Sequence, residues 1–313
     1  MFDQRTLARR LVAVSSKHAT FNYEKAFSCN LGLVQPHEQA QLREKTIAIA
    51  GLGGVGGAHL LTLTRMGVGK FHIADFDQFE VHNMNRQAGA FTSTLGKDKA
   101  DVMEAMTYDI NPTALVRKFN EGITVANIDN FLDNVDVAID ALDYFALEAR
   151  ALFYRVAYEK KIPVVVAGPY GCSASLLVFM PGGMTWHDYF AIDLAEQESD
   201  RYLLFALGSA PRATQIGYLD LNYVNFAEKR GPSLSLAIEL CAGVVAAEVM
   251  KLLLKRGPIL AAPYFHQFDA YRYRYSVGKL RWGNRGPMQR LKLLLFRRML
   301  HKKNLTRSLL QQV

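Results

Sequence analysis

A glycine cluster between an apolar run and a helical pattern constrains the fold of this chain more than any other feature. The apolar residues 47–50 lead into "GLGGVGG", and a helical pattern follows over residues 55–66. Gly51, Gly53 and Gly56 match G-x-G-x-x-G, whose glycines permit a tight turn, a close approach of phosphate and close helix–strand contact. Because a helix N-terminus presents unpaired N–H groups, this order predicts a phosphate-binding unit.

The next predicted strand supports a nucleotide ligand. The strand at residues 71–74 ends at Asp75, where an acid can accept hydrogen bonds from ribose hydroxyls. The turn is not a P-loop, because Gly56 is followed by Gly-Ala-His and not by Lys and a hydroxyl residue. The glycine turn alone therefore leaves a dinucleotide and a differently bound ATP as alternatives.

Strands and helices alternate through the first half of the chain. Predicted strands at 115–119, 135–139 and 164–167 alternate with helical patterns at 97–108, 127–132 and 147–160. This alternation predicts an α/β fold with a doubly wound, mainly parallel, Rossmann-like sheet. An extra strand and helix portion follows: a half-exposed strand at 173–180, irregular chain at 181–232, a helix at 234–255, a strand at 264–275 and a basic amphipathic helix at 287–310. We predict three parts: a helical segment at 1–45, a nucleotide-binding domain at 46–280 and a basic tail at 281–313.

Composition narrows the class of protein. The chain has 313 residues, of which 50% are apolar, so it can bury a core without metal or disulfide staples. Its three cysteines include no CxxC pair, which excludes a four-cysteine zinc site and favours a reducing cytoplasm. The N-terminus lacks the apolar core of a signal peptide, and charged residues interrupt the apolar segment 236–254, so we expect a cytoplasmic protein without a membrane span.

A polar stretch decides between the two nucleotides. "IADFDQFEVHNMNRQ" places Asp77, Asn83 and Arg86 just beyond the strand end, where ligands bind in doubly wound sheets. Arg86 offers a planar fork for phosphate, Asn83 a neutral donor, and Lys99 a compact charge at the start of the next helix. Hydride transfer needs no such donors, whereas a triphosphate does, so the stretch favours ATP.

A second strand end carries two acids. In "VAIDALDYF", Asp140 and Asp143 follow the strand at 135–139. A carboxylate at this position suits Mg²⁺, which prefers oxygen ligands and bridges to phosphate oxygens. The alternative for Asp143 is a helix N-cap.

These segments together carry a family resemblance. From about residue 25 to 275 the chain resembles the ubiquitin-activating-enzyme superfamily, in its bacterial ThiF/MoeB/HesA branch, through "GLGGVGG", "ADFDQFEVHNMNRQ", "LGKDKA", "INP", "IDALDYFALEAR", "KIPVV" and "AGVVAAEVMKLL". The resemblance implies a ThiF-type adenylation domain at 46–280 that binds ATP and Mg²⁺. It implies adenylation of a carboxylate, typically the C-terminal glycine of a ubiquitin-like or sulfur-carrier protein, or a peptide, by an enzyme that is commonly a homodimer.

The resemblance also implies roles for individual residues. Arg86, Lys99 and Asp143 would act in the reaction, and Asp143 would bind Mg²⁺. The nucleotide would be held by Gly51, Gly53, Gly54, Gly56, Asp75, Asp77, Asn83, Arg86 and Lys99.

Departures from the family pattern qualify the chemistry. Thr185 and Asp188 stand where many members have a zinc-binding cysteine pair, so we expect no zinc. Residues 173–240 contain no cysteine, and we expect Cys172 and Cys241 to be small buried residues. Adenylation without a thioester on the chain itself follows from this pattern.

The N-terminal part departs as well. Cys29 stands where the family places an arginine that reaches the triphosphate of the partner subunit. Either another cation such as Lys25 takes its place, or the handling of ATP is weakened. This difference keeps a non-catalytic ThiF-like partner subunit as an alternative. A tRNA-modifying dehydratase that activates a carboxylate and an NAD-dependent oxidoreductase are the others.

The net charge of +8 comes from the tail, because the rest of the chain is close to neutral. The predicted tail helix has a leucine-rich face with basic residues around it. It is expected either to pack in a dimer or against the domain, or to contact an acidic partner, tRNA or a membrane surface.

Overall fold

The computed structural model describes residues 20–225 and 231–310, with side chains as far as residue 299. Residues 1–19 of the segment predicted to be helical lie outside this range. Within the described ranges, no helix combines the length and apolar character needed to cross a bilayer.

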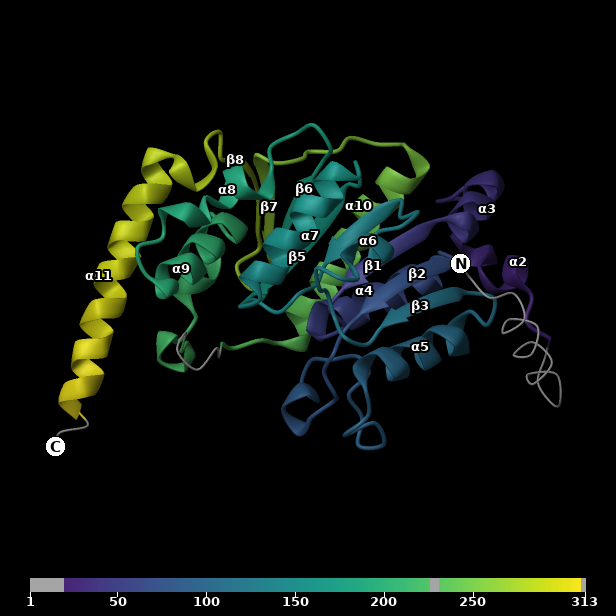
Figure 1. Ribbon diagram of the computed structural model, residues 1–313, viewed down its shortest axis with the longest axis horizontal. Helices are drawn as coiled ribbons and strands as arrows, with labels where there is room; N and C mark the ends of the chain where they lie inside the picture. The colour runs from purple at the N-terminus through teal and green to yellow at the C-terminus, as the bar shows by residue number, and fades with distance from the viewer. Residues whose placement is uncertain (1–19, 226–230, 311–313) are drawn as a thin grey trace.

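One mixed sheet forms the centre of the molecule (Figure 1). Its strand order is β3-β2-β1-β4-β5-β6-β7-β8. The strands β1 to β5 pair with one another in parallel, and β6, β7 and β8 are added in antiparallel orientation. The strands are β1 Thr46–Ala50, β2 Lys70–Ala74, β3 Leu115–Phe119, β4 Val137–Asp140, β5 Val164–Tyr170, β6 Ser173–Phe179, β7 Tyr264–Asp269 and β8 Arg274–Lys279. The predicted fold class, a mainly parallel doubly wound sheet with an added portion, is confirmed.

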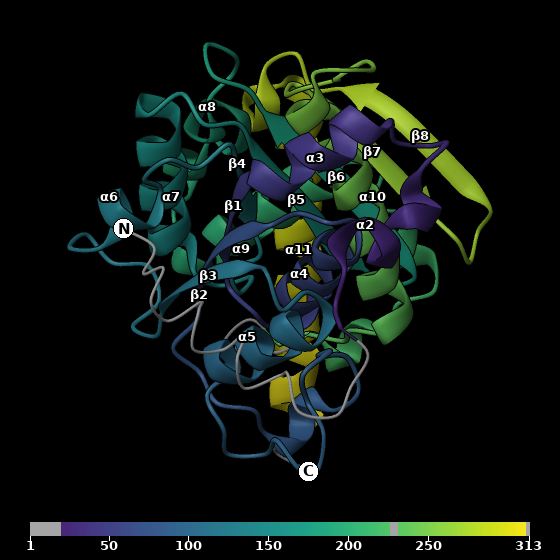
Figure 2. The same cartoon turned by 90° about the vertical axis from the view of Figure 1, so that its right-hand side faces the viewer.

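Helices cover both faces of the sheet (Figure 2). The α-helices are α2 Tyr23–Ala26, α3 Pro36–Glu44, α4 Gly54–Arg65, α5 Lys99–Ile110, α6 Ile128–Phe131, α7 Leu147–Glu159, α8 Trp186–Phe190, α9 Glu198–Ser209, α10 Ser235–Leu254 and α11 Pro287–Leu310. Short 3₁₀ turns lie at Ser28–Asn30, Val81–Asn83, Ile192–Leu194, Thr214–Gly217, Leu221–Tyr223 and Gly283–Arg285.

The alternation of side chains in β1 shows how the two layers arise. Ile47 and Ile49 pack into the cluster formed with α3, α4, α5 and α10. Ala48 and Ala50 pack into the opposite cluster, formed with α6, α7, α8 and α9. Because successive side chains of a strand point to opposite faces, a fully buried β1 needs apolar residues at every position.

Three expectations about the second half were wrong. β6 is buried at all seven positions, not half-exposed, because it lies between β5 and β7 and is covered on both faces. Its serines are tolerated there because the hydroxyls of Ser173 and Ser175 donate to the carbonyls of Tyr170 and Ser209.

The described part of residues 181–232 is not irregular throughout, because it contains α8 and α9. Gln197 and Asp200 cap the start of α9. The strand expected at 264–275 is a hairpin of β7 and β8. The carboxylate of Asp269 accepts a hydrogen bond from the backbone N–H of Arg272 at its turn, where Tyr273 adopts a left-handed conformation with φ 51°.

Candidate nucleotide-binding site

The glycine turn between β1 and α4 is packed against the end of β4. Gly51 has φ +93°, and a Cβ there would lie 2.3 Å from the carbonyl oxygen of Ala141. A Cβ on Gly56 would lie 1.9 Å from the carbonyl oxygen of Gly51. Side chains are therefore excluded at both positions. Gly53 is more open, since the nearest atom to its added Cβ is Nε2 of Gln87 at 3.7 Å.

Asp75 holds the glycine turn from the end of β2. Its Oδ2 accepts a hydrogen bond of 2.6 Å from the N–H of Leu52, and its Oδ1 accepts one of 2.9 Å from the N–H of Asp77. Burial raises the pKa of Asp75, and the two hydrogen bonds and Lys99 act in the opposite direction. The acid expected to bind ribose therefore also shapes the turn; ribose binding stays a prediction.

Lys99 and Asp77 form an ion pair next to this acid. Nζ of Lys99 lies 2.9 Å from Oδ2 of Asp77, and the lysine is buried whereas the aspartate is exposed. The N–H of Lys99 also donates to the carbonyl of Asp77, which fixes the start of α5 to the loop after β2. A phosphate at this place would share Lys99 with Asp77.

Arg86 lies over the start of α4 and is held there by neutral oxygens. Its Nη1 donates to the carbonyl of His82 at 3.0 Å and to Oδ1 of Asn85 at 2.9 Å, and Cγ lies 3.8 Å from the position of a Cβ on Gly54. In the described part of the chain it makes no ion pair within 4 Å. Burial lowers the pKa of Arg86, whereas Asp143 raises it. A half-buried guanidinium held by neutral oxygens suits an anionic ligand.

Asn83 builds the turn that carries Arg86. Its Oδ1 accepts a hydrogen bond of 3.0 Å from the N–H of Glu80, and its carbonyl accepts from the N–H groups of Arg86 and Gln87. The side chain is buried, so chiefly its NH₂ group remains for a ligand. The predicted donor is thus also a structural residue.

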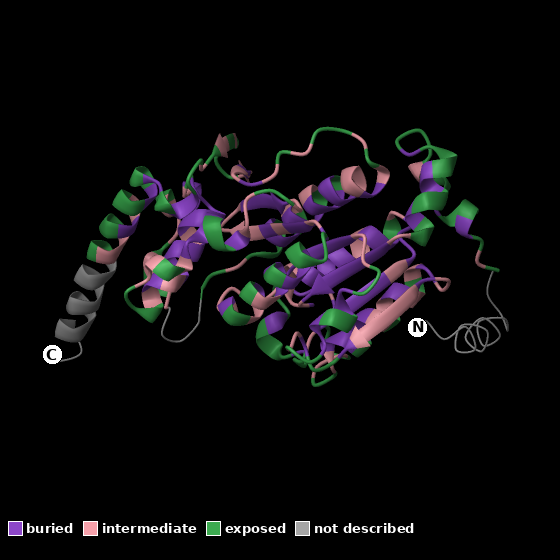
Figure 3. Cartoon of the chain, turned by 45° about the horizontal axis from the view of Figure 1, so that its top comes forward, coloured by how far each residue is buried: buried purple, intermediate pink, exposed green. Residues whose placement is uncertain are grey.

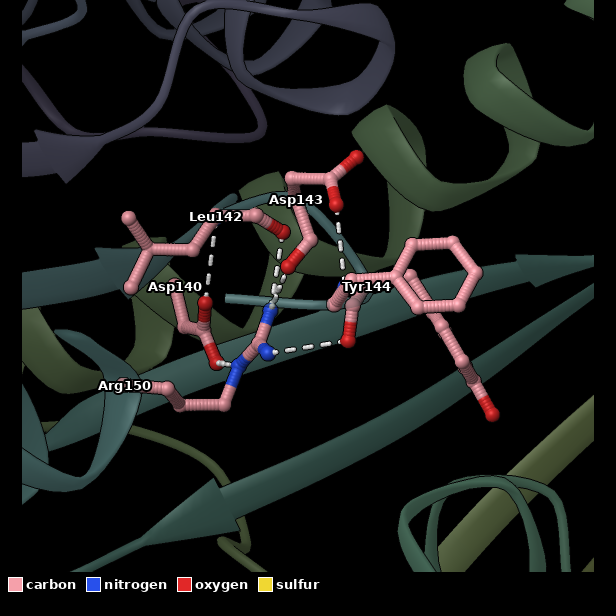
Figure 4. A network of polar contacts seen from close by, with 6 residues as sticks. Asp140, Leu142, Asp143, Tyr144 and Arg150 are labelled. Atoms are coloured by element: carbon pink, nitrogen blue, oxygen red, sulfur yellow. Dashed lines mark hydrogen bonds and ion pairs between the residues drawn. The ribbon is translucent and has the colours of Figure 1, made fainter. Parts of the chain in front are cut away.

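The loop after β4 contains Asp143, and the buried side chain of Arg150 holds this loop in place (Figure 4). Nε of Arg150 lies 2.7 Å from Oδ2 of Asp140, and its Nη2 donates to the carbonyls of Leu142 at 2.8 Å and Asp143 at 3.2 Å. The Asp143 carboxylate is exposed and accepts a hydrogen bond of 2.9 Å from the N–H of Phe145. The helix N-cap alternative for Asp143 is wrong, because Ala146 caps α7.

Two residues of the site were not among the predicted ones. Arg150 is the last residue of the motif "IDALDYFALEAR", and an arginine on the helix after two strand-end acids is the signal that points to it. Gln87 ends the polar stretch and faces Gly53; its buried Oε1 has no hydrogen-bond partner among the described residues. An unpartnered buried amide beside an open glycine turn fits a polar ligand such as a nucleotide.

The cysteines lie in three different environments. Cys241 is buried on α10, and burial raises the pKa of its thiol. The expectation of burial was wrong for Cys172, which is half-buried because it lies in the turn between β5 and β6 and not within a strand. Cys29 is exposed.

Thr185 and Asp188, at the positions of the family's cysteines, hydrogen-bond to each other at the start of α8. Among the described residues no group of three His, Cys, Asp or Glu side chains is placed to hold a metal. The lack of zinc stays a prediction that elemental analysis of the purified protein tests.

Known proteins match this chain in parts. It is 34% identical over 151 residues to the tRNA threonylcarbamoyladenosine dehydratase of Haemophilus influenzae, and this match covers 48% of this chain and 57% of that protein. It is 37% identical over 131 residues to ubiquitin-like modifier-activating enzyme 5 of Bombyx mori, and this match covers 38% of this chain and 32% of that enzyme. The chain therefore spans about half or less of the length of these relatives.

Solved structures share the fold over a longer stretch. The crystal structure of PaaA superposes with a TM-score of 0.61 at 19% identity, covering 88% of this chain and 81% of PaaA. Escherichia coli MccB with ATP superposes with a TM-score of 0.58 at 17% identity, covering 78% of this chain and 66% of MccB. The family model described as "ThiF family" matches residues 27–286. On this match, the chain belongs to the ThiF family.

Proposed function

We propose that this protein is an ATP-dependent adenylyltransferase that activates a carboxylate. The observation that carries the proposal is the position of Arg86, a half-buried guanidinium beside the glycine turn that makes no ion pair in the described ranges. Family membership supports the use of ATP. Arg86 and Lys99 together offer a fork and a point charge for a triphosphate.

The chemistry needs positioning more than proton transfer. A carboxylate oxygen attacks the α-phosphorus of ATP, a bond forms between them, and the bond to the bridging oxygen breaks, so that pyrophosphate leaves with the electron pair. No base is needed, because a carboxylate is already ionised near neutral pH. Arg86 and Lys99 would stabilise the negative charge that grows on the phosphates. Mg²⁺ held by the exposed Asp143 carboxylate would add positive charge there.

We propose the C-terminal carboxylate of a ubiquitin-like protein, a sulfur-carrier protein or a peptide as the acyl substrate. The Bombyx mori relative, by its name, activates a ubiquitin-like modifier. Cys241 is buried on α10, Cys172 lies between β5 and β6, and Cys29 lies in the exposed 3₁₀ turn Ser28–Asn30, so none of them belongs to β1, α4 or the glycine turn that joins these elements. We therefore propose that the acyl adenylate passes to an acceptor on another molecule and not to a cysteine of this chain.

A carboxylate on a tRNA nucleoside is the second candidate, and the β7–β8 hairpin favours it. Tyr271, Tyr273 and Tyr275 are exposed, with 96% of Tyr273 accessible, and arginines alternate with them. The strands β1, β4 and β5 are parallel, so the end of β5 at Tyr170 lies at the same side of the sheet as the glycine turn that follows β1. Ser173 pairs with both Tyr170 and Asp269, the last residue of β7, so the hairpin turn lies at that side as well. Aromatic rings interleaved with arginines suit unpaired bases. The Haemophilus influenzae relative, by its name, acts on tRNA.

We also propose that the active form is a homodimer, as the family resemblance implies. Cys29 and Lys25 are both exposed near the start of the described chain, so a neighbouring copy can contact either. Light scattering of the purified protein measures the state directly; a monomer at working concentration would contradict this proposal.

Pyrophosphate exchange tests the reaction and sorts the substrates. Labelled pyrophosphate should enter ATP only when Mg²⁺ and the correct carboxylate are present. One set of assays contains ubiquitin-like proteins and peptides from the same genome, and the other contains tRNA bearing a threonylcarbamoyl nucleoside. Titration calorimetry with ATP and NAD is run beside them. Tight NAD binding without ATP binding would overturn the proposal, and ATP binding without exchange on any carboxylate would favour a non-catalytic partner subunit.

A further inference from the structure

The inner face of helix α11 is fixed to the body of the protein. Leu293 is buried, and with Phe296 it packs against three leucines of α9. The guanidinium of Arg297 bonds both carboxylate oxygens of Asp200, at 2.9 and 2.7 Å. Nε2 of Gln289 donates to the carbonyl of Leu207 at 2.9 Å, and Nζ of Lys292 to that of Pro211 at 2.6 Å. These contacts determine which side of α11 faces outward.

The outer face of α11 is apolar and partnerless in the described structure. We define it by Met288, Arg290, Leu291, Leu294, Leu295, Arg298 and Met299. Its five apolar side chains are between 38% and 63% exposed, and the spacing from Met288 to Leu291, Leu295 and Met299 keeps one row along the helix. Figures 1 and 3 show α11 on one flank of the molecule, with α9 on one side and an exposed surface on the other.

The positive charge of the outer face of α11 indicates which kind of partner binds there. No Asp or Glu follows Asp269 in the sequence, and Arg290 and Arg298 are exposed on the outer face itself. Two copies of α11 that paired through their outer faces would bring like charges together, which opposes self-association. RNA would satisfy the arginines but not the row of leucine and methionine side chains.

We infer that the outer face of α11 docks the protein onto an anionic lipid surface. An amphipathic helix with an apolar row and flanking basic residues lies in the plane of the bilayer, with its apolar side chains among the acyl chains and its cations at the headgroups. Because no described helix meets the requirements of a span, this is attachment to one leaflet. The inference does not depend on the proposed reaction.

Flotation with vesicles tests the inference on the full chain. Vesicles of phosphatidylcholine with about one third phosphatidylglycerol carry the anionic headgroups, and vesicles of phosphatidylcholine alone are the neutral comparison. The wild-type protein should float with the anionic vesicles only, and less of it should float as salt is added. Arg290→Glu/Arg298→Glu and Leu291→Gln/Leu295→Gln should each lower the bound fraction at least about tenfold.

A matched control separates the outer face from the net charge. Arg65→Glu/Lys161→Glu reverses two exposed charges elsewhere and should leave flotation unchanged. Thermal melts check that every variant folds. Two results would overturn the inference: wild-type protein that stays in solution with anionic vesicles at low salt, or a control that loses as much binding as the α11 variants. If wild-type protein ignores vesicles but forms an oligomer that the leucine variant abolishes, the outer face is an interface between copies.

Discussion

Asp140 at the end of β4 and Arg150 on α7 form a buried ion pair in which Oδ2 and Nε are 2.7 Å apart. Burial alone would lower the pKa of Arg150, but Asp140 raises it overall. The same guanidinium bonds the carbonyls of Leu142 and Asp143 and lies over the ring of Phe205, 4.4 Å from its centroid. The shape of the loop that carries Asp143 therefore depends on this pair.

Replacing Arg150 should strongly destabilise the fold. Arg150→Met leaves the Asp140 carboxylate buried without a partner, and we expect the free energy of unfolding to fall by about 3–5 kcal/mol. Urea titration measures it. The control is Arg155→Met on the same helix, where an exposed pair with Glu159 at 3.2 Å contributes at most about 1 kcal/mol. Equal losses in the two variants would contradict a structural role for the buried pair.

Arg86 should matter for the reaction and Cys172 should not. Arg86→Ala removes a preorganised donor, so pyrophosphate exchange should fall about a hundred- to a thousandfold. Arg86→Lys should rescue little, because an ammonium cannot reproduce the planar fork. Cys172→Ser should keep exchange, since no thiol takes part in adenylation. The assigned roles are wrong if Cys172→Ser, still folded by thermal melt, abolishes exchange while Arg86→Ala retains it.

Two glycine-to-alanine changes should have opposite effects on stability. In Gly56→Ala the new Cβ meets the carbonyl oxygen of Gly51, so the turn must shift and we expect a loss of about 1–3 kcal/mol. In Gly243→Ala, inside α10, nothing lies within 4 Å of the new Cβ, and the helix should gain about 0.5–1 kcal/mol. Chemical denaturation of both variants measures the difference. A neutral result for Gly56→Ala would show that the turn is less tightly packed than described.

His59 should make the protein sensitive to mild acid. It is fully buried on α4 with neither ring nitrogen bonded within the described structure, and burial lowers its pKa from 6.5 to about 3. As pH falls, the unfolded chain therefore takes up the proton first. The stability that depends on neutral His59 is fully present above about pH 6.5 and is lost progressively toward pH 3, by about 2 kcal/mol at pH 5.

Unfolding free energies between pH 7.5 and 5 measure this effect. His59→Leu should flatten the pH dependence, because the proton-binding group is removed. His37→Gln, which changes an exposed imidazole, should leave the slope as it is. An unchanged slope in His59→Leu would show that the acid sensitivity comes from another group.

Local patterns predicted the first half of the fold and the tail helix well. The glycine fingerprint, the apolar run before it and Asp75 predicted β1, α4 and β2 to within one residue or two. The bounds of α11 agree with the predicted 287–310 because its amphipathic period is continuous. These elements are encoded by neighbours in sequence, so a single sequence suffices for them.

Contacts between distant segments could not be read in the same way. β6 contains serines, and only its place between two strands shows that both faces are buried. The pairing of Arg150 with Asp140 depends on how α7 folds back over β4. Within the candidate site, the sequence predicted which residue types gather at the strand ends. It did not show that Asp75 and Asn83 are already bonded to their own loops.

The hydrogen bonds from Leu52 and Asp77 to Asp75 preorganise the glycine turn. Fixing a flexible residue costs about 1–2 kcal/mol of conformational entropy, and here that cost is met when the protein folds. A nucleotide then binds to a turn that already has its final conformation, so its contacts contribute to affinity without first ordering the loop. By this reasoning Asp75 acts twice on binding, through any contact with the ribose and through the entropy that it removes from the empty site.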